Sequence, residues 1–219
     1  MAADGAIATT CPYCGVGCGV LVAPAEGSGF RVRGDPDHPA NLGRLCSKGA
    51  ALADTLGLDG RLLQPMVRGV ETDWDTALDA VADGFRTIVE RHGPDAVALY
   101  VSGQLLTEDY YVANKLAKGV LGTANIDTNS RLCMASAVAA YKRAFGADTV
   151  PCDYEDLAPA DLVVLVGSNL AWCHPVLFQR LRHAKEQRPA LRVVVIDPRR
   201  TATCDLADLH LPLAPGTDG

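Results

Sequence analysis

Four cysteines near the N-terminus constrain this chain more than any other feature. Cys11, Cys14 and Cys18 follow the spacing C-x2-C-x3-C, and Cys46 comes 27 residues later. In a reducing compartment such a group is more often a metal site than a set of disulfides. Four thiolates suit a cubane [4Fe-4S] cluster, whereas structural zinc usually takes two C-x2-C pairs. The spacing therefore favours iron-sulfur over zinc and leaves zinc open.

The residues around these cysteines predict a small lobe with little core. The apolar stretches Val20–Val22 and Phe30–Val32 are typical of a short antiparallel hairpin. Residues 34–43 are rich in Pro, Asp, Asn and Gly and predict a loop, after which Ser47 is expected to cap a helix that runs to about Leu56. We expect this cluster lobe to occupy residues 1–64.

Residues 65–219 alternate apolar runs with helical patterns. The expected strands are Val97–Val101, Leu162–Val166 and Arg192–Ile196. The expected helices run from Asp73 to a stop at Gly93, and over Thr107–Leu121, Met134–Phe145 and Pro175–Gln187. The order of strand, loop and helix predicts an α/β fold, namely a doubly wound, mostly parallel domain.

Composition and charge narrow the class of protein. Hydrophobic residues make up 48% and charged residues 21%, as in an ordinary globular protein. The formal net charge of -6 opposes binding to a phosphate backbone, so we expect no nucleic-acid partner. The apolar runs are too short to span a bilayer, and the start MAADGAIATT lacks the features of an export signal. We therefore expect a cytoplasmic protein without a membrane partner.

Two further motifs are ambiguous by themselves. Gly167, Ser168 and Asn169 follow an expected buried strand and precede a helix, where backbone N–H groups can receive a pyrophosphate, although an ordinary turn has the same pattern. Asp197 ends the next strand and could accept hydrogen bonds from a ribose or guanine, and Arg199 could meet phosphate.

Four more cysteines stand singly. A lone cysteine before an apolar helix, such as Cys133, is usually a small buried hydrophobe, and the same expectation applies to Cys152, Cys173 and Cys204. The five histidines show no spacing typical of metal ligands.

Taken together, six sequence blocks resemble the bis-molybdopterin-guanine-dinucleotide (bis-MGD) oxidoreductases of molybdenum or tungsten, a family that includes formate dehydrogenases and prokaryotic nitrate reductases. The blocks are TCPYCGVGCGV with GRLCSKG, SGQ at 102–104, NSRLCMASA at 129–137, GSNLAWCHP at 167–175, IDPRRTATC at 196–204 and LAPGTDG at 213–219. They occur in family order over the whole chain. Family members continue for several hundred residues, so the chain resembles an N-terminal fragment.

The resemblance implies roles for particular residues. It places the [4Fe-4S] cluster on Cys11, Cys14, Cys18 and Cys46, and it makes Cys133 the thiolate ligand of molybdenum. Lys48 corresponds to a family lysine between cluster and pterin, and is grouped with Cys133 as catalytic. The implied contacts of the pterin and its guanine dinucleotide are Gln104, Asn129, Gly167, Ser168, Asn169, His174, Asp197, Arg199, Gly216 and Asp218.

The residue after Cys133 bears on the reaction. Formate dehydrogenases of this family typically place histidine after the metal ligand, whereas Met134 stands here, as in cysteine-ligated nitrate reductases. The flanking sequence resembles the assimilatory, cytoplasmic nitrate reductases. This implies oxygen-atom transfer, in which nitrate accepts two electrons and two protons and leaves as nitrite and water.

Partners and alternatives follow from the same resemblance. Electrons would come from a flavoprotein reductase or a ferredoxin and pass through the cluster and by Lys48 to the pterin. Formate dehydrogenase is the alternative enzyme. A non-catalytic iron-sulfur electron-transfer module is the other alternative, and the motif around Cys133 counts against it.

Overall fold

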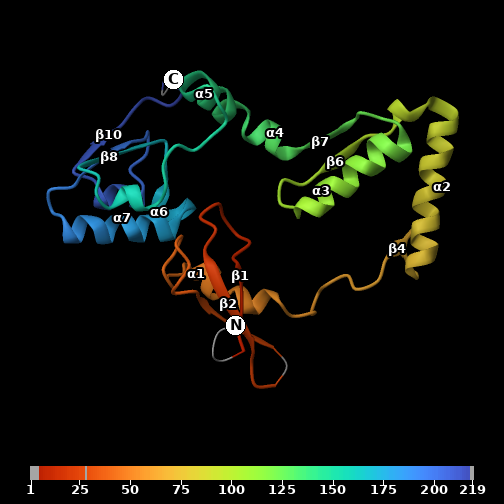
Figure 1. The fold of residues 1–219 in the computed structure, drawn as a ribbon, viewed down its shortest axis with the longest axis horizontal. Coiled ribbons are helices and arrows are strands. Elements are labelled where there is room, and N and C mark those ends of the chain that lie inside the picture. Colours follow the sequence, from red (N-terminus) through yellow and green to blue (C-terminus); the bar gives the residue numbers. More distant parts are fainter. Residues whose placement is uncertain (1–4, 28, 218–219) are drawn as a thin grey trace. The chain divides into compact units, whose positions relative to one another are not determined.

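The computed structural model describes residues 5–27 and 29–217, and Figure 1 traces their elements. Contacts group the chain into two compact units, one of Met1–Asp59 with Pro151–Gly219 and the other of Gly60–Val150. The first break lies near the expected boundary at residue 64. The last stretch groups with the cluster lobe, so the division into 1–64 and 65–219 stays a prediction about domains.

The N-terminal part of the first unit is a three-stranded antiparallel sheet. Its strands are β1 (Ile7–Thr10), β2 (Gly19–Pro24) and β3 (Phe30–Gly34), in the order β1-β2-β3. The pairing of Val22 with Val32 confirms the predicted hairpin. The sequence does not predict strand β1, because its residues IATT show no alternation of apolar and polar side chains. In the structure all four are exposed.

The helix after the lobe's loop differs from the expectation. It comprises α1 (Ser47–Ala50) and, after Ala51, the 3₁₀ helix η1 (Leu52–Thr55). Cys46 occupies the N-cap position, without a side-chain capping bond, and Ser47 is the first helical residue. The prediction that Ser47 caps the helix is therefore wrong by one position.

The C-terminal part of the first unit is a parallel sheet in the order β10-β9-β8. The strands are β8 (Leu162–Val166), β9 (Arg192–Ile196) and β10 (Leu209–Leu211). The helices are η4 (Glu155–Leu157), α6 (Leu170–Cys173), α7 (Pro175–Gln187) and η5 (Ala202–Leu206). The predicted strand-helix-strand unit is confirmed at the expected residues, with Pro175 in the first helical turn.

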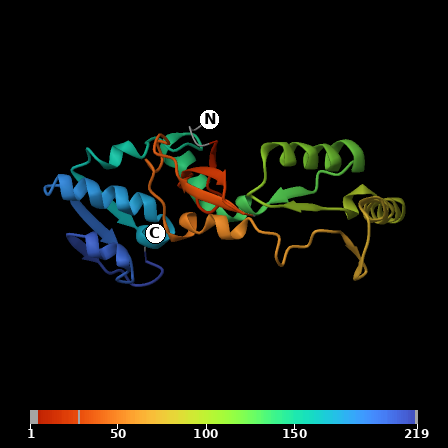
Figure 2. The ribbon, with the colours of Figure 1, turned by 90° about the horizontal axis from the view of Figure 1, so that it is seen from below.

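One face of this sheet holds the core of the unit. Leu181 of α7 and Val193 and Val195 of β9 are fully buried in one apolar cluster, and Figure 2 shows α7 lying along the sheet. Strand β8 is not buried on both faces as expected. Val163 and Leu165 pack on the cluster, whereas Leu162, Val164 and Val166 alternate with them on an exposed face.

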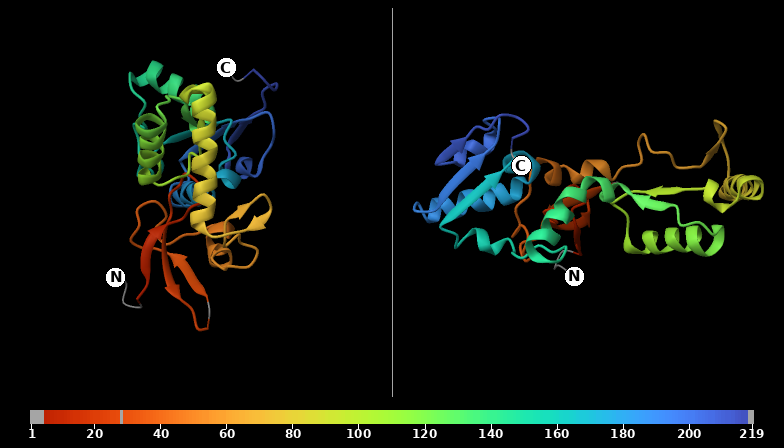
Figure 3. Two further views of the ribbon diagram at one scale, coloured as in Figure 1. Left: turned by 90° about the vertical axis from the view of Figure 1, so that its right-hand side faces the viewer. Right: turned by 90° about the horizontal axis from the view of Figure 1, so that it is seen from above.

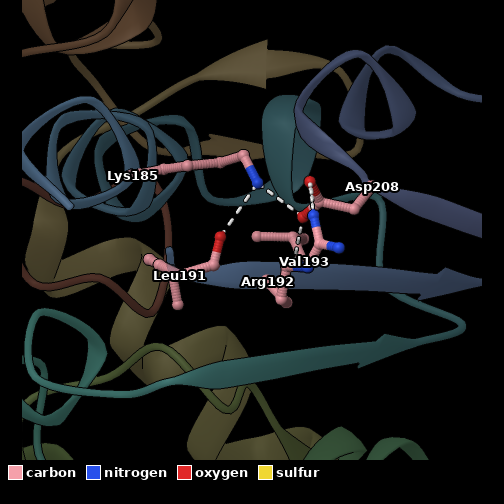
Figure 4. A network of polar contacts seen from close by, with 5 residues as sticks. All are labelled: Lys185, Leu191, Arg192, Val193 and Asp208. Atoms are coloured by element: carbon pink, nitrogen blue, oxygen red, sulfur yellow. Dashed lines mark hydrogen bonds and ion pairs between the residues drawn. The ribbon is translucent and has the colours of Figure 1, made fainter. Parts of the chain in front are cut away.

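A polar network joins α7, β9 and the segment before β10 (Figure 4). Lys185 donates to the Asp208 carboxylate at 2.5 Å and to the Leu191 carbonyl at 3.0 Å. Asp208 also accepts from the backbone N–H of Val193 at 2.7 Å and pairs with Arg192 at 3.3 Å. The Lys185 hydrogen bond, followed by that of Val193, lowers the pKa of Asp208 to about 2. The ionised carboxylate therefore stabilises the strand arrangement.

Acid should remove this contribution. Because the pKa of Asp208 is depressed in the folded state, its stabilising effect is complete above the ordinary value of 3.8 and is lost as pH falls towards 2. We expect Asp208→Asn to lower the melting temperature at pH 7, and the difference from wild type to shrink between pH ~4 and ~2. Paired melts at each pH cancel acid effects common to both proteins. A difference independent of pH would contradict this assignment.

The second unit begins with a two-stranded antiparallel ribbon, β4 (Met66–Val67) and β5 (Val70–Glu71), followed by α2 (Trp74–His92). The Asp73 carboxylate caps α2 by accepting from Thr76 N–H at 2.7 Å, which lowers the pKa of Asp73. Gly93 ends the helix at a φ of 83°. The predicted helix is confirmed, and Figure 3 shows it uninterrupted.

The rest of this unit places two parallel strands beside helices. Strand β6 (Leu99–Val101) follows η2 (Pro94–Ala96) and pairs in parallel with β7 (Ile126–Thr128). The helices are α3 (Thr107–Asn114), the π-helix η3 (Lys115–Leu121), α4 (Asn129–Cys133) and α5 (Ala135–Phe145). These elements make the fold mixed α/β, with antiparallel strands first and parallel sheets later, as predicted.

Two expectations for this unit need correction. Val97–Val101 is not a fully buried strand, because β6 begins at Leu99 and the Tyr100 side chain is 66% exposed. The helix expected over Thr107–Leu121 changes to π geometry at Lys115. The sequence does not predict this change, because the wider hydrogen-bond register of a π-helix leaves no distinct sequence pattern. Within the described residues, no helix is long and apolar enough to cross a membrane.

Candidate functional site

The four N-terminal cysteines meet in one partly buried region. Cys11 N–H donates to the Cys18 carbonyl at 2.8 Å, which closes the loop between β1 and β2. Cys11, Cys14 and Cys46 pack against the buried Cys18. The pKa of the Cys18 thiol is raised to about 11, mainly by burial and further by Cys14, Cys11 and Cys46 in that order. Positive iron would relieve this penalty by binding thiolates.

Asn41 joins the two segments that carry these cysteines. Its fully buried side chain accepts from the Gly19 N–H at 2.8 Å and donates to the carbonyls of Gly19 at 3.0 Å and Arg44 at 2.9 Å. Gly19 follows Cys18, and Arg44 lies two residues before Cys46. A Cβ at Gly19 would lie 2.3 Å from Cγ of His38, so only glycine permits this approach. One amide thus sets the spacing between the two segments.

The donor set fits an iron-sulfur cluster. Val16 is only 3% exposed, and its backbone N–H has no acceptor among residues 5–27 and 29–217, which is unusual for a buried amide. An N–H group beside the thiols suits hydrogen bonding to a cluster sulfur. In the same described ranges no three His, Cys, Asp or Glu side chains are placed to hold a single metal ion. Lys48 lies exposed in α1.

A second group lies at the carboxyl ends of β6 and β7, where the two predicted segments 102–104 and 129–133 meet. Asn129 Oδ1 accepts from the Gly103 N–H at 2.5 Å. A Cβ at Gly103 would lie 2.7 Å from Ser130 Oγ and 2.8 Å from Asn129 Oδ1, so a larger residue would displace these side-chain ends. The carboxyl edge of parallel strands is where α/β sheets place ligands.

Cys133 is the last residue of α4, and its side chain is exposed rather than buried. Gln104 is exposed as well. Met134, at the junction between α4 and α5, is 43% exposed. The expectation of a small buried hydrophobe is therefore wrong for Cys133, and its thiol is accessible to a ligand on the surface of this unit.

The third group lies at the carboxyl ends of β8 and β9 in the first unit. Gly167 has a φ of 57°, and its N–H donates to the Ile196 carbonyl at 2.9 Å. Asn169 Oδ1 accepts from Thr203, whose hydroxyl accepts from Ala171 N–H. The helix that follows Asn169 is the four-residue α6. It is separated from α7 by His174, whose backbone is not helical. The expected turn between a strand and a helix is present, and its role as a pyrophosphate cradle stays a prediction.

Asp197 and Arg199 lie beside this turn. Asp197 is 8% exposed and accepts from the Arg199 N–H at 2.8 Å. A cavity of about 300 Å³ adjoins Arg199 and is lined by Asn169, Trp172, Arg199, Arg200, Thr201 and Ala202. Within the described chain, the buried Thr201 hydroxyl has no hydrogen-bond partner. Two arginines and an unsatisfied hydroxyl suit a phosphate-bearing ligand.

The remaining predicted residues are more scattered. His174 is the half-buried N-cap of α7, and Gly216, at a φ of 82°, forms a turn closed by Thr217. Asp218 lies outside the described residues. Cys204 is buried in the core as expected, whereas Cys152 and Cys173 are exposed, so the expectation of burial is wrong for these two.

Sequence reasoning missed several residues that shape these groups. Asn41 and Thr203 act through hydrogen bonds to distant backbone or side chains, which no local pattern announces. Tyr154 and Arg180 contact the cluster lobe from more than 130 residues away.

Comparison with known families covers almost the whole chain. The pattern of the family described as "Molybdopterin oxidoreductase Fe4S4 domain" matches residues 6–57, and that described as "Molybdopterin oxidoreductase" matches residues 61–219. The solved structure of acetylene hydratase from Pelobacter acetylenicus is similar with a TM-score of 0.76. The two sequences are 21% identical, and the match covers 94% of this chain and 29% of the acetylene hydratase chain. At this identity the similarity supports the fold alone.

Several curated relatives are named as nitrate reductases. One from Klebsiella oxytoca is 67% identical over 96% of this chain and 24% of its own length. A periplasmic nitrate reductase from Desulfovibrio desulfuricans is 46% identical over 95% of this chain and 28% of its length. An assimilatory nitrate reductase from Haloferax mediterranei is 42% identical over 97% of this chain and 30% of its own length. The chain thus spans a quarter to a third of the length of these relatives.

Proposed function

This chain belongs to the molybdopterin oxidoreductase family, and from that premise we propose that the protein containing it reduces nitrate to nitrite. The observation that carries the proposal is the similarity to nitrate reductases along nearly the whole chain, at 67% identity in the Klebsiella oxytoca protein. The pair Cys133 and Met134 supports it, since methionine offers no titratable group for proton abstraction from formate carbon.

The family's Fe4S4 and molybdopterin domains imply a [4Fe-4S] cluster and a molybdopterin cofactor. We assign the cluster to Cys11, Cys14, Cys18 and Cys46, whose thiols lie together. We assign the molybdenum to the accessible thiol of Cys133, a soft ligand that suits this metal. When bound, the molybdenum cofactor, in its bis-MGD form, supplies the oxygen-atom transfer chemistry.

The chain's own residues would hold that cofactor in two places. Gln104 and Asn129 lie at the strand ends near Cys133, where Asn129 is fixed by Gly103. The other place is the carboxyl edge of β8 and β9, with Gly167, Ser168, Asn169, Asp197 and Arg199. There the Arg199 guanidinium and the Thr201 hydroxyl could bind phosphate oxygens. His174, Gly216 and Asp218 are proposed contacts on family resemblance alone.

Electrons would reach the cofactor through the cluster. We assign Lys48 to the route between cluster and pterin, because it is two residues beyond Cys46 and its charge could stabilise added electrons. The donor would be a protein, either a flavoprotein reductase or a ferredoxin.

We further propose the assimilatory, cytoplasmic type of nitrate reductase. The support is the flanking sequence around Cys133 and Cys173 and the similarity to the Haloferax mediterranei protein. The similarity to the Desulfovibrio desulfuricans protein favours the periplasmic type to a comparable degree. Fractionation of the native cells, followed by a nitrate reductase assay of each fraction, separates the two types.

The substrate assignment is tested on the complete protein purified without air. With a reduced dye as donor we expect nitrite to form from nitrate, and with formate we expect no reduction of an oxidised dye. The physical reason is that nitrate needs no base at the substrate atom, whereas formate oxidation benefits from one beside the metal. Formate oxidation without nitrate reduction would replace this proposal by formate dehydrogenase.

A further inference from the structure

Tyr154 and Arg180, in the C-terminal part of the first unit, both donate hydrogen bonds to the cluster lobe. Tyr154, just before η4, directs its hydroxyl at the carbonyls of Gly15 and Val16, at 3.1 and 3.0 Å. Both carbonyls lie between Cys14 and Cys18. Arg180 of α7 donates to the carbonyls of Pro39 and Ala40, at 2.6 and 3.1 Å, in the loop that precedes Cys46.

The two side chains also contact each other. The Arg180 guanidinium carbon lies 5.9 Å from the centre of the Tyr154 ring, within the range of a cation–π interaction. Below them, Val176 of α7 is buried against Val16 and Cys18. A single pair of residues therefore fixes both segments that carry the four cysteines, and an apolar contact supports it.

The Tyr154 hydroxyl also affects the orientation of the N–H groups in the loop between Cys14 and Cys18. A trans peptide is planar and points its N–H opposite its carbonyl, so holding the Gly15 and Val16 carbonyls sets the direction of the Val16 and Gly17 N–H groups. Gly17 N–H is used by the Cys14 carbonyl at 3.3 Å. The Val16 N–H has no acceptor within the described chain and is free to meet a sulfur atom.

The geometry also brings positive charge to this part of the unit. Tyr154 packs against the apolar cluster that includes Cys18 and Cys14, and the Arg180 guanidinium lies over its ring.

We propose that Tyr154 and Arg180 are positioning residues for the iron-sulfur cluster, a brace that fixes the N–H groups of the ligand loop and raises the cluster's reduction potential. Hydrogen bonds to cluster sulfurs and nearby positive charge both stabilise the more negative, reduced cluster. This inference rests on the assignment of the cluster to the four cysteines and goes beyond the reaction proposed above.

The test uses Tyr154→Phe in the complete protein with its cluster, because phenylalanine keeps the ring under Arg180 and removes only the hydroxyl. We expect a more negative midpoint potential in a redox titration followed by EPR, with altered g values. We also expect iron loss to a chelator to become roughly two- to tenfold faster, as for one lost hydrogen bond. A purely structural role would leave the potential unchanged.

Matched variants make the result specific. Tyr110→Phe removes a hydroxyl that donates to the Ser102 carbonyl at 2.7 Å in the other unit, and it should leave the cluster potential as in wild type. Arg180→Gln removes the charge over the ring and should shift the potential in the same direction as Tyr154→Phe. A wild-type potential and wild-type iron loss in Tyr154→Phe would overturn the brace. A wild-type protein without iron and sulfide would overturn the cluster assignment and the brace together.

Discussion

Replacing Cys133 with alanine should abolish nitrate reduction by the complete protein while leaving the cluster's EPR signal in place. The expected loss exceeds ~100-fold, because removing even an outer partner of a metal ligand costs 10–100-fold. The structural reason for the separation is that Cys133 ends α4 in the second unit, whereas the four clustered cysteines all belong to the first. Nitrite production and EPR, measured on the same preparation, check both halves of the prediction.

Cys152→Ala provides the control for this experiment. Cys152 is also exposed, and no predicted site includes it, so its loss should leave both measurements unchanged. Molybdenum content distinguishes two outcomes for Cys133→Ala, since a bound but inactive cofactor indicates a lost ligand and an absent cofactor indicates lost binding. Near-normal nitrate reduction in the variant would show that Cys133 is not the metal ligand.

The sequence predicts the elements that depend on local patterns. The apolar runs of β8 and β9 and the helix from Pro175 to Gln187 were placed at the correct residues, because five-residue apolar strands, Pro at the first helical position and helical spacing are all local signals. The same holds for the helix that begins near Asp73 and for its stop at Gly93.

Features that depend on tertiary context were not predictable. The π-helix over Lys115–Leu121 has the same composition as an α-helix, and the exposed edge strand β1 has no apolar face to reveal it. The exposure of every second residue of β8 depends on which face α7 covers. The spacing of the four cysteines pointed to their meeting, whereas their supports in Asn41 and Tyr154 arise from contacts across the fold.

Asn41→Ala should have the largest effect on the cluster among substitutions outside its ligands. The change leaves the Gly19 N–H without its partner in a buried place and the Arg44 carbonyl without its partner in a partly buried one, at about 1–3 kcal/mol for each group. The sum, roughly 2–6 kcal/mol, is a large part of the stability of a typical domain. Because these groups adjoin Cys18 and Cys46, we expect iron content to fall well below the about four per chain of a cubane.

Iron and sulfide analysis, with a thermal melt of the same samples, measures this effect. Asn125→Ala is the matched control, because its amide also donates to a backbone carbonyl, that of Asp95 at 2.9 Å, but lies exposed in the other unit. It should retain full iron and melt within a few degrees of wild type, since a surface substitution usually changes stability by about 0.5 kcal/mol or less. Full iron content in Asn41→Ala would mean that the thiolates and the iron position the two loops without the amide. The cluster, rather than the polypeptide, would then set the spacing between Cys18 and Cys46.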